Sequence, residues 1–119
     1  TIDRDHQPSK AATIARAQEI KGSPLTPAER AKIINGGLAA NVPNNVHRAG
    51  PTYGPKNTVA LINSDKGDLA GAAARDANAI VSNAKTMSPE NLQSLEKAAE
   101  KIKSINNFEY GNWIKGLLD

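Results

Sequence analysis

The stretch Asp3-Arg4-Asp5-His6-Gln7-Pro8-Ser9 governs how this chain is interpreted, together with residues 42–54, Val-Pro-Asn-Asn-Val-His-Arg-Ala-Gly-Pro-Thr-Tyr-Gly. The two stretches contain both histidines of the 119-residue chain, His6 and His47. Asp5 and His6 place an oxygen ligand beside an imidazole, a pairing that can hold a divalent metal and take a proton from water. We therefore expect a functional site built from these two stretches, with the rest of the chain serving as scaffold.

Short elements surround the first stretch. Residues 1–7 alternate in character and predict one edge strand. Pro8 or Ser9 then opens a helix, because proline suits a first turn and serine suits a cap. The apolar spacing continues to Lys21, and Gly22-Ser23-Pro24 ends this helix.

A second helix and strand lead to the second stretch. Thr26, Pro27 and Glu29 form a capping-box pattern with proline at the first position, and the helix they start ends at residues 35–37. Residues 38–42 predict a short strand. Residues 43–56 contain three Pro, two Gly and two Asn, so we expect a long loop without regular structure, of the kind that is often functional.

Beyond residue 57 the pattern is helical. Thr58 is expected to cap one helix reaching Asn83, and Ser88-Pro89-Glu90 opens another. A last short helix carries Trp113, which we expect to fill the core.

Composition limits the alternatives. Apolar residues make up 39% of the chain, much of it alanine, with one Phe, one Trp and two Tyr, which favours close-packed helices in a single domain. The absence of cysteine excludes disulfide frameworks and thiolate zinc sites. No apolar run approaches the roughly 20 residues of a membrane span. Because candidate chemistry begins at Asp3, close to the first residue, Thr1, we expect the chain to be the carboxy-terminal piece of a longer polypeptide.

Positive charge is concentrated in the half that contains the histidines. Residues 1–57 carry eight Lys or Arg against four acids, whereas residues 58–119 carry seven against eight. Basic charge near a catalytic group suits a polyanionic substrate, although a solvated helix face gives the same pattern. Neither a Gly-x-Ser-x-Gly elbow, a phosphate-binding Gly-rich loop nor a dinucleotide fingerprint is present.

Several side chains near His47 are candidates for contact with a substrate. Arg48 or Lys56 can hold a phosphate oxygen or stabilise charge in a transition state. Asn57 can donate to metal-bound oxygens, although capping of the following helix is the simpler role. The candidate substrate-binding set is Lys10, Arg48, Tyr53, Lys56 and Asn57.

Three spaced motifs resemble a known group of proteins. They are Asp3-Arg4-Asp5-His6-x-Pro8-Ser9-Lys10-Ala11, then Leu25-Thr26-Pro27-Ala28-Glu29, and Val42-Pro43-x-x-Val46-His47-x-x-Gly50-x-Thr52-Tyr53-Gly54-x-Lys56-Asn57-Thr58. This pattern resembles the carboxy-terminal toxin domains of bacterial polymorphic toxins of the contact-dependent inhibition, Rhs-repeat and secreted-effector types. Those domains are similar to the HNH/endonuclease VII group of nucleases. The resemblance covers residues 3–58.

The resemblance implies a fold and a set of roles. The fold would be mainly α with a small β element, a single domain over residues 1–119 built around a treble-clef (ββα-metal-like) core. Residues 1–58 would hold the active-site segments and residues 59–119 the helical scaffold. His6 would be the general base, and Asp5 and His47 would be ligands of Mg²⁺ or Zn²⁺. Catalysis would involve His6, His47 and Arg48, in a metal-dependent DNase.

Other partners and activities also follow. A nuclease toxin implies a cognate immunity protein, a nucleic acid substrate and delivery into the cytoplasm of a target cell, with no membrane contact. One alternative is a metal-independent ribonuclease, acting on tRNA or rRNA, with His6 and His47 as an acid/base pair. Another is a non-catalytic helical binding module in which both histidines are structural.

Overall fold

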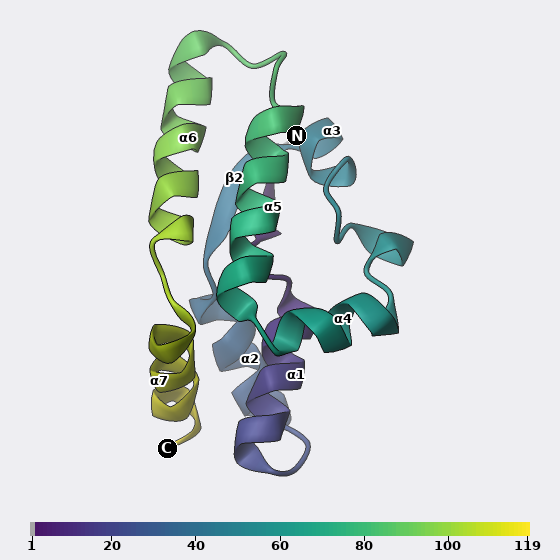
Figure 1. Ribbon diagram of the computed structural model, residues 1–119, viewed down its shortest axis with the longest axis vertical. Coiled ribbons are helices and arrows are strands. Elements are labelled where there is room, and N and C mark those ends of the chain that lie inside the picture. The colour runs from purple at the N-terminus through teal and green to yellow at the C-terminus, as the bar shows by residue number, and fades with distance from the viewer. Residues whose placement is uncertain (1) are drawn as a thin grey trace.

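The computed structural model describes residues 2–119. Within that range the chain forms seven α-helices and a two-stranded sheet (Figure 1), so the expectation of a mainly α fold with a small β element is confirmed. The elements in chain order are β1 (Ile2–His6), α1 (Lys10–Lys21), α2 (Pro27–Gly36), β2 (Ala39–Pro43), α3 (Asn44–Arg48), a 3₁₀ turn (Gly54–Lys56), α4 (Val59–Lys66), α5 (Leu69–Asn83), α6 (Pro89–Lys103) and α7 (Asn107–Leu118). None of the helices in this range is long and apolar enough to cross a membrane.

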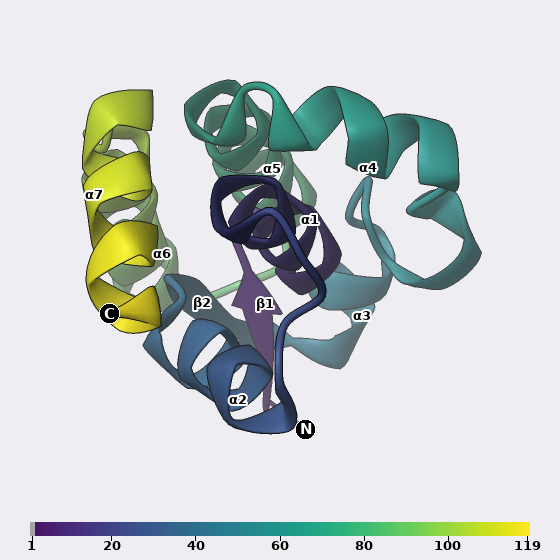
Figure 2. The same ribbon diagram turned by 90° about the horizontal axis from the view of Figure 1, so that it is seen from below.

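The sheet brings the two histidine-bearing stretches together. Strand β1 runs antiparallel to β2, with Ile2 opposite Pro43 and His6 opposite Ala39. The backbone N–H of Gln7 donates to the Leu38 carbonyl at 3.0 Å and extends the pairing by one step. Helix α3 follows β2 directly and lies against β1, and helices lie on several sides of the sheet (Figure 2). Segments about 40 residues apart in sequence therefore become neighbours.

The helix ends follow the predicted caps. The Ser9 hydroxyl accepts from the Ala12 backbone N–H at the start of α1, and Gly22, at φ 80°, ends that helix in the left-handed conformation that glycine adopts without strain. Thr26 and Glu29 form the expected capping box at the start of α2. These local signals set where α1 begins and ends and where α2 begins.

The single helix expected over residues 58–83 is wrong, because the chain forms α4 and α5 instead. Thr58 caps α4 as expected, accepting from the Leu61 backbone N–H. Asp68 then caps a new helix by accepting from the Gly71 backbone N–H at 2.9 Å. An aspartate side chain that accepts from the first free N–H groups of a helix stabilises a new helix start at that point. The apolar periodicity alone did not reveal this start.

The expectation of irregular structure throughout residues 43–56 is also wrong. Helix α3 occupies Asn44–Arg48 and a 3₁₀ turn occupies Gly54–Lys56. Pro43 precedes the first residue of α3 and Pro55 lies in the first turn of the 3₁₀ segment, positions where a missing backbone N–H costs little. The prolines therefore delimit short helical turns instead of preventing them.

Part of the core lies between α5 and α6, where alanines alternate with larger aliphatic residues. Ala73, Ala77 and Ile80 are fully buried on α5, and they belong to the same core as Leu95, Ala99 and Ile102 of α6. Alanine allows the two helices, which run side by side in Figure 1, to approach closely.

Trp113 does not fill the core as expected. It is partly exposed, and its indole ring lies close to Gly36, whereas the neighbouring Ile114 is fully buried. Ile114 occupies the interior position on this face of α7, and an aliphatic side chain there leaves no indole N–H buried without a partner.

Candidate functional site

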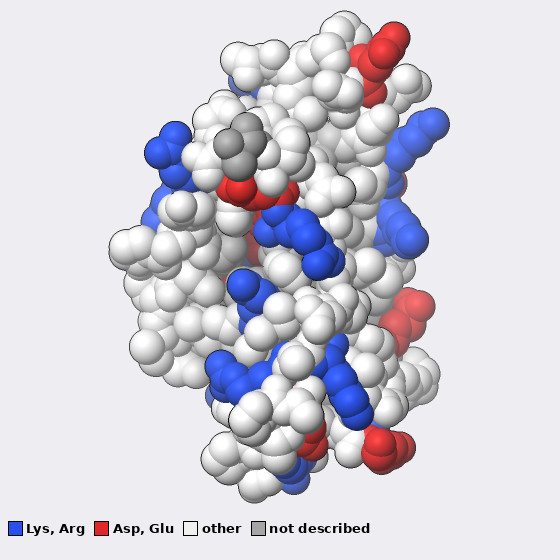
Figure 3. Space-filling view, turned by 180° about the vertical axis from the view of Figure 1, so that it is seen from behind, with Lys and Arg blue, Asp and Glu red and all other residues white. Residues whose placement is uncertain are grey.

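A cleft of about 520 Å³ lies where β1, α1, α2 and α3 meet. Its walls include Asp5, His6 and His47, so the fold brings together three of the four residues that were predicted to take part in catalysis or metal binding, while Arg48 is not among the lining residues. Figure 3 shows this side of the molecule, where blue Lys and Arg side chains run along the middle of the face beneath red acidic atoms. The cleft therefore combines imidazoles, a carboxyl group and a cationic border.

His6 is held by the end of α2. Its Nε2 lies 3.0 Å from the Ile34 carbonyl oxygen. Because a carbonyl only accepts, Nε2 carries the proton and Nδ1 keeps a lone pair in the neutral ring. Burial lowers the pKa of His6, partly offset by the Ile34 carbonyl, while the nearby cations Lys10 and Arg4 lower it further. His6 is thus a neutral imidazole with one nitrogen available as a base.

His47 is held by a different kind of group. Its Nδ1 lies 3.1 Å from Oδ2 of Asp3, and the amide of Asn44 donates to the same oxygen at 2.7 Å. The Asn44 and His47 hydrogen bonds hold the pKa of Asp3 below its ordinary value. The Tyr53 ring meets the His47 ring edge to face, with centroids 4.9 Å apart. Asp3 and Asn44 were not among the predicted site residues, although Asp3 and Asp5 share one face of a strand by their spacing.

Asp5 is buried at the floor of the cleft. Burial raises its pKa, and the charge of His47 partly offsets that effect. Gln7 is fully buried, and within residues 2–119 neither of its amide atoms reaches a partner at hydrogen-bonding geometry. Buried polar groups without partners are costly, so a buried amide of this kind calls for an explanation.

The cationic border differs from the predicted one. Lys10 lines the cleft as expected, together with Arg4 and Arg30, which the sequence analysis missed. Arg4 shares the strand face of His6 at a spacing of two, a signal that was available. Arg30 lies on α2, far from both motifs in sequence, and gave no local signal.

Arg48 and Lys56 are exposed and lie outside the cleft lining. The ammonium group of Lys56 donates to the Arg48 carbonyl oxygen at 2.9 Å, which joins α3 to the 3₁₀ turn. The structure therefore does not bring these two predicted phosphate-binding residues to the cleft.

Asn57 lines the cleft. The expectation that it caps the following helix is wrong. Its amide nitrogen lies 3.3 Å from the Ser9 hydroxyl oxygen at the start of α1, while Thr58 is the cap of α4. Thr52, beside Tyr53, also lines the cleft. The loop after α3 thus contributes polar groups to the lining of the cleft.

A buried ion cluster joins α4 to α5. Arg75 binds both carboxylate oxygens of Asp65 at 2.8 Å and one oxygen of Asp76 at 2.8 Å. Burial raises the pKa of Asp76 to about 6, against the lowering effect of Arg75, and the charges of Asp65 and Asp5 raise it further. This cluster was not predicted, because Asp65, Arg75 and Asp76 resemble ordinary surface residues of helices in the sequence.

The ligand set expected for a treble-clef metal site is incomplete. Within residues 2–119 no group of three or more His, Cys, Asp or Glu side chains is placed to hold a metal ion. A structural or catalytic zinc site takes at least three protein ligands. The treble-clef part of the expected fold therefore finds no support in the arrangement of these side chains.

One known protein resembles this chain over 69% of the chain's length. The chain is 45% identical over 82 residues to Deoxyribonuclease CdiA of Dickeya dadantii (strain 3937), a stretch that covers 69% of this chain and 2% of that protein. Wherever that stretch begins, 82 consecutive residues of 119 have to include residues 38–82, and with them His47 and Asn57. No family model matches the chain, and no solved structure matches it. The chain is thus homologous to a small part of a much longer protein that carries the name of a deoxyribonuclease.

Proposed function

We propose that this chain is a deoxyribonuclease domain that hydrolyses phosphodiester bonds in the cleft between His6 and His47. One observation carries the proposal: the only two histidines of the chain line one cleft bordered by Arg4, Lys10 and Arg30. The similarity to Deoxyribonuclease CdiA supports DNA as the substrate. A cationic cleft attracts the phosphate backbone through charge, independently of base sequence.

The two imidazoles would divide the proton transfers. His6 has Nδ1 available and a pKa lowered by burial, so it would take a proton from the attacking water. His47 in its protonated form, with Nδ1–H held by Asp3, would give its Nε2 proton to the leaving oxygen as the phosphorus–oxygen bond breaks. Lys10 and Arg4 would hold non-bridging oxygens of the phosphate.

The residues present fit Mg²⁺ better than Zn²⁺. Asp5 offers a carboxylate at the floor of the cleft, and Mg²⁺ commonly binds through one or two carboxylates while sharing water and substrate oxygens. We propose Asp5 as the principal ligand of such an ion. When bound, the Mg²⁺ ion would supply positive charge that stabilises the five-coordinate transition state at phosphorus and the leaving oxygen.

A second candidate is hydrolysis without a metal, favoured by the presence of two imidazoles with available nitrogens in one cleft. Acid/base pairs of this kind cleave RNA through a cyclic phosphate, a route that requires the 2′-hydroxyl group and is closed to DNA. The nature of the substrate therefore separates the two candidates.

We further propose that the domain acts as a toxin of the contact-dependent inhibition type. The resemblance of residues 3–58 to toxin domains supports this role. Delivery into a target cell and neutralisation by a cognate immunity protein are parts of the same proposal.

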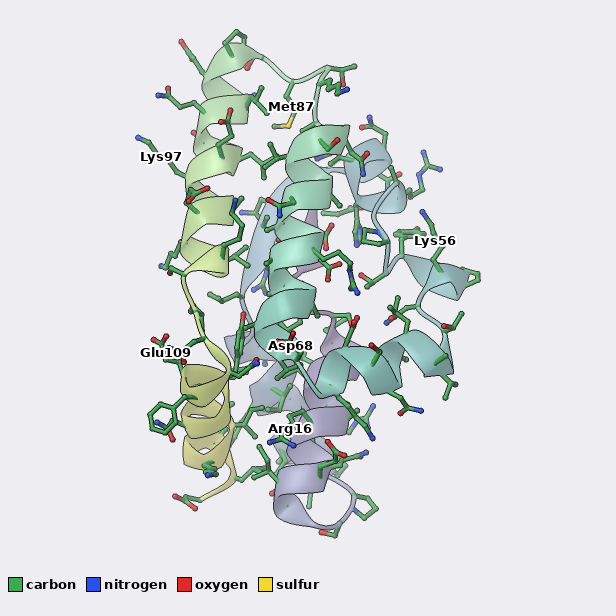
Figure 4. All side chains as sticks on the ribbon, in the orientation of Figure 1. Arg16, Lys56, Asp68, Met87, Lys97 and Glu109 are labelled. Atoms are coloured by element: carbon green, nitrogen blue, oxygen red, sulfur yellow. The ribbon has the colours of Figure 1, made fainter. Side chains whose placement is uncertain are left out.

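The experiment is a cleavage assay of purified protein on supercoiled plasmid DNA and total RNA, with Mg²⁺ or with EDTA. We expect nicking of DNA that EDTA and His6→Ala each abolish, and that His47→Ala lowers strongly. Lys97→Ala, on the outer face of α6 (Figure 4), is the control and should cleave normally. Thermal unfolding checks that each variant is folded. Cleavage of RNA in EDTA would instead establish the paired-histidine mechanism, and full activity of folded His6→Ala would refute the role of His6.

A further inference from the structure

We propose that Asp3 is a positioning residue that holds His47 as its Nδ1–H tautomer and so directs Nε2 toward the cleft. The catalytic consequence of this inference rests on the proposed function. The tautomer itself does not, and it can be measured in the absence of any substrate.

Two donors converge on a single oxygen of Asp3. Oδ2 lies 2.7 Å from the Asn44 amide nitrogen and 3.1 Å from Nδ1 of His47. Asn44 and His47 are three residues apart on α3, a spacing that places both side chains on the same side of a helix. Strand β1 supplies the carboxylate from 44 residues away in sequence, so the contact depends on the tertiary fold.

The chemistry of the acceptor fixes the proton on the ring. An ionised carboxylate can only accept, so Nδ1 of His47 has to be the donor. In the neutral imidazole the lone pair then lies on Nε2. The Tyr53 ring, inclined at 85° to the imidazole, packs against His47 and limits its rotation.

His6 presents the other nitrogen. The Ile34 carbonyl holds the proton of His6 on Nε2, which leaves Nδ1 as the acceptor. The cleft is therefore lined by one imidazole of each tautomer, one fixed by a carbonyl group and the other by a carboxylate. A carboxylate partner also stabilises a positively charged imidazole, which a carbonyl group does less strongly.

Two substitutions separate orientation from charge. Because Asn44 and His47 bond to the same oxygen, Asp3→Asn can place its amide carbonyl oxygen there and keep both hydrogen bonds while it loses the charge. Asp3→Ala removes the acceptor altogether. His47 should then revert to the Nε2–H tautomer that free histidine prefers in water.

The test is nitrogen NMR of the two imidazole rings in ¹⁵N-labelled protein, at about pH 8, well above the ordinary pKa of histidine. EDTA is present and DNA is absent. We expect Nδ1–H for His47 in the wild type and in Asp3→Asn, and Nε2–H in Asp3→Ala. His6 should remain Nε2–H in all three proteins, which makes it an internal control for folding. An Nε2–H signal for His47 in the wild type overturns the proposal without need of any variant, and so does an unchanged Nδ1–H signal in Asp3→Ala.

Cleavage kinetics give the second readout. Asp3→Ala should lower kcat by about 10- to 100-fold with little change in KM, the range found for groups that orient a reacting side chain. Asp3→Asn should recover part of that loss. If the wild-type protein cleaves no DNA, the proposed function fails while the ring assignment stands. If it cleaves DNA and Asp3→Ala is fully active with a reverted tautomer, the positioning role is refuted.

Discussion

Nε2 of His6 donates a hydrogen bond of 3.0 Å to the carbonyl oxygen of Ile34, at the end of helix α2. This contact joins the strand that carries Asp5 to a helix whose residues Arg30 and Ile34 also line the cleft. It fixes the free nitrogen of His6 as Nδ1, while burial keeps the ring neutral by lowering its pKa. The base of the proposed reaction is therefore oriented by backbone and not by another side chain.

The lowered pKa of His6 predicts the acid limb of the pH–rate profile. A general base is active when unprotonated, and His6 takes up its proton only when the pH falls to a pKa below its ordinary value of 6.5. Cleavage measured between about pH 5 and pH 8 should thus be more than half its maximum at about pH 6.5. NMR titration of the His6 ring in the same buffers shows whether the acid limb of the profile follows the ionisation of His6. A midpoint at or above the ordinary value would contradict this environment for His6.

The same shift affects stability. The unfolded chain binds a proton at His6 more readily than the folded chain, so this residue lowers stability as the pH falls from 6.5 through its folded pKa.

Gly37 provides a steric test of the His6 orientation. A Cβ at this position would lie 3.2 Å from the Ile33 carbonyl oxygen and 3.4 Å from Cδ2 of His6. Gly37→Ala should therefore crowd the Ile33 carbonyl at the end of α2 and bring a methyl group into contact with the His6 ring, and we expect kcat to fall by about 10-fold.

The neighbouring Gly36 is the matched control. A Cβ there would lie 3.3 Å from Cζ2 of Trp113, an equally tight contact that does not involve His6. Gly36→Ala should affect thermal unfolding about as much as Gly37→Ala while leaving cleavage unchanged. Equal kinetics for the two variants would show that the end of α2 does not set the position of His6.

Local chemistry made much of the fold predictable. The caps at Ser9, Thr26 and Thr58 and the stop at Gly22 depend on residues adjacent in sequence, and each lies where the sequence indicated. The break at Asp68 was missed because a single carboxylate outweighs apolar periodicity that continues across it. The short helix α3 was missed because proline count was given more weight than proline position.

The site residues also fall into two groups, those that were visible in the sequence and those that only tertiary contacts bring to the site. His6, His47 and Asp5 were identified because histidines are rare in this chain and an Asp-His pair is visible in sequence. Arg30, Asn44 and Ile34 reach the cleft or its histidines only through tertiary contacts, which leave no short-range pattern. Arg48 and Lys56 illustrate the converse, since proximity to His47 in sequence did not place them in the cleft lining.

Arg75 predicts a large stability effect. Arg75→Met removes the partner of two buried carboxylates, Asp65 and Asp76, and uncompensated buried charge costs about 3–5 kcal/mol. Urea unfolding at neutral pH measures the change. Arg16→Met is the control, because the Arg16–Glu19 pair is exposed and 3.4 Å long, and its loss should change stability by less than about 0.5 kcal/mol. Similar values for the two variants would mean that the cluster is solvated and not buried.

The raised pKa of Asp76 should make folding stability depend on pH with a sign opposite to that of most carboxylates. Its folded pKa of about 6 exceeds the ordinary 3.8, so the folded state binds more protons between these values and stability falls as the pH rises through that window. Asp76→Asn, which can still accept from Arg75, should remove this dependence and gain up to about 3 kcal/mol above pH 6.

Asp68→Asn is the contrasting variant. Hydrogen bonds from Asn107 and from the Gly71 backbone lower the pKa of Asp68, so the stability that it contributes is present above its ordinary pKa and is lost as the pH falls. Urea unfolding should show differences from wild type that slope in opposite directions, for Asp76→Asn between pH 3.8 and about 6 and for Asp68→Asn around and below pH 3.8. Parallel slopes would contradict the assignment of Asp76 as a destabilising buried charge.

The cationic border of the cleft predicts the salt dependence of DNA binding. Each Lys or Arg that neutralises a phosphate contributes about 0.9 to the slope of log affinity against log salt concentration. In the catalytically impaired His6→Ala background, adding Lys10→Gln or Arg30→Gln should therefore reduce the slope by about one each, measured by fluorescence anisotropy of a short duplex between about 50 and 200 mM salt. Lys97→Gln removes the same charge from α6, where the side chain points away from the rest of the molecule (Figure 4), and should leave the slope unchanged. Equal losses for all three substitutions would show that net charge, and not the cleft, attracts the DNA.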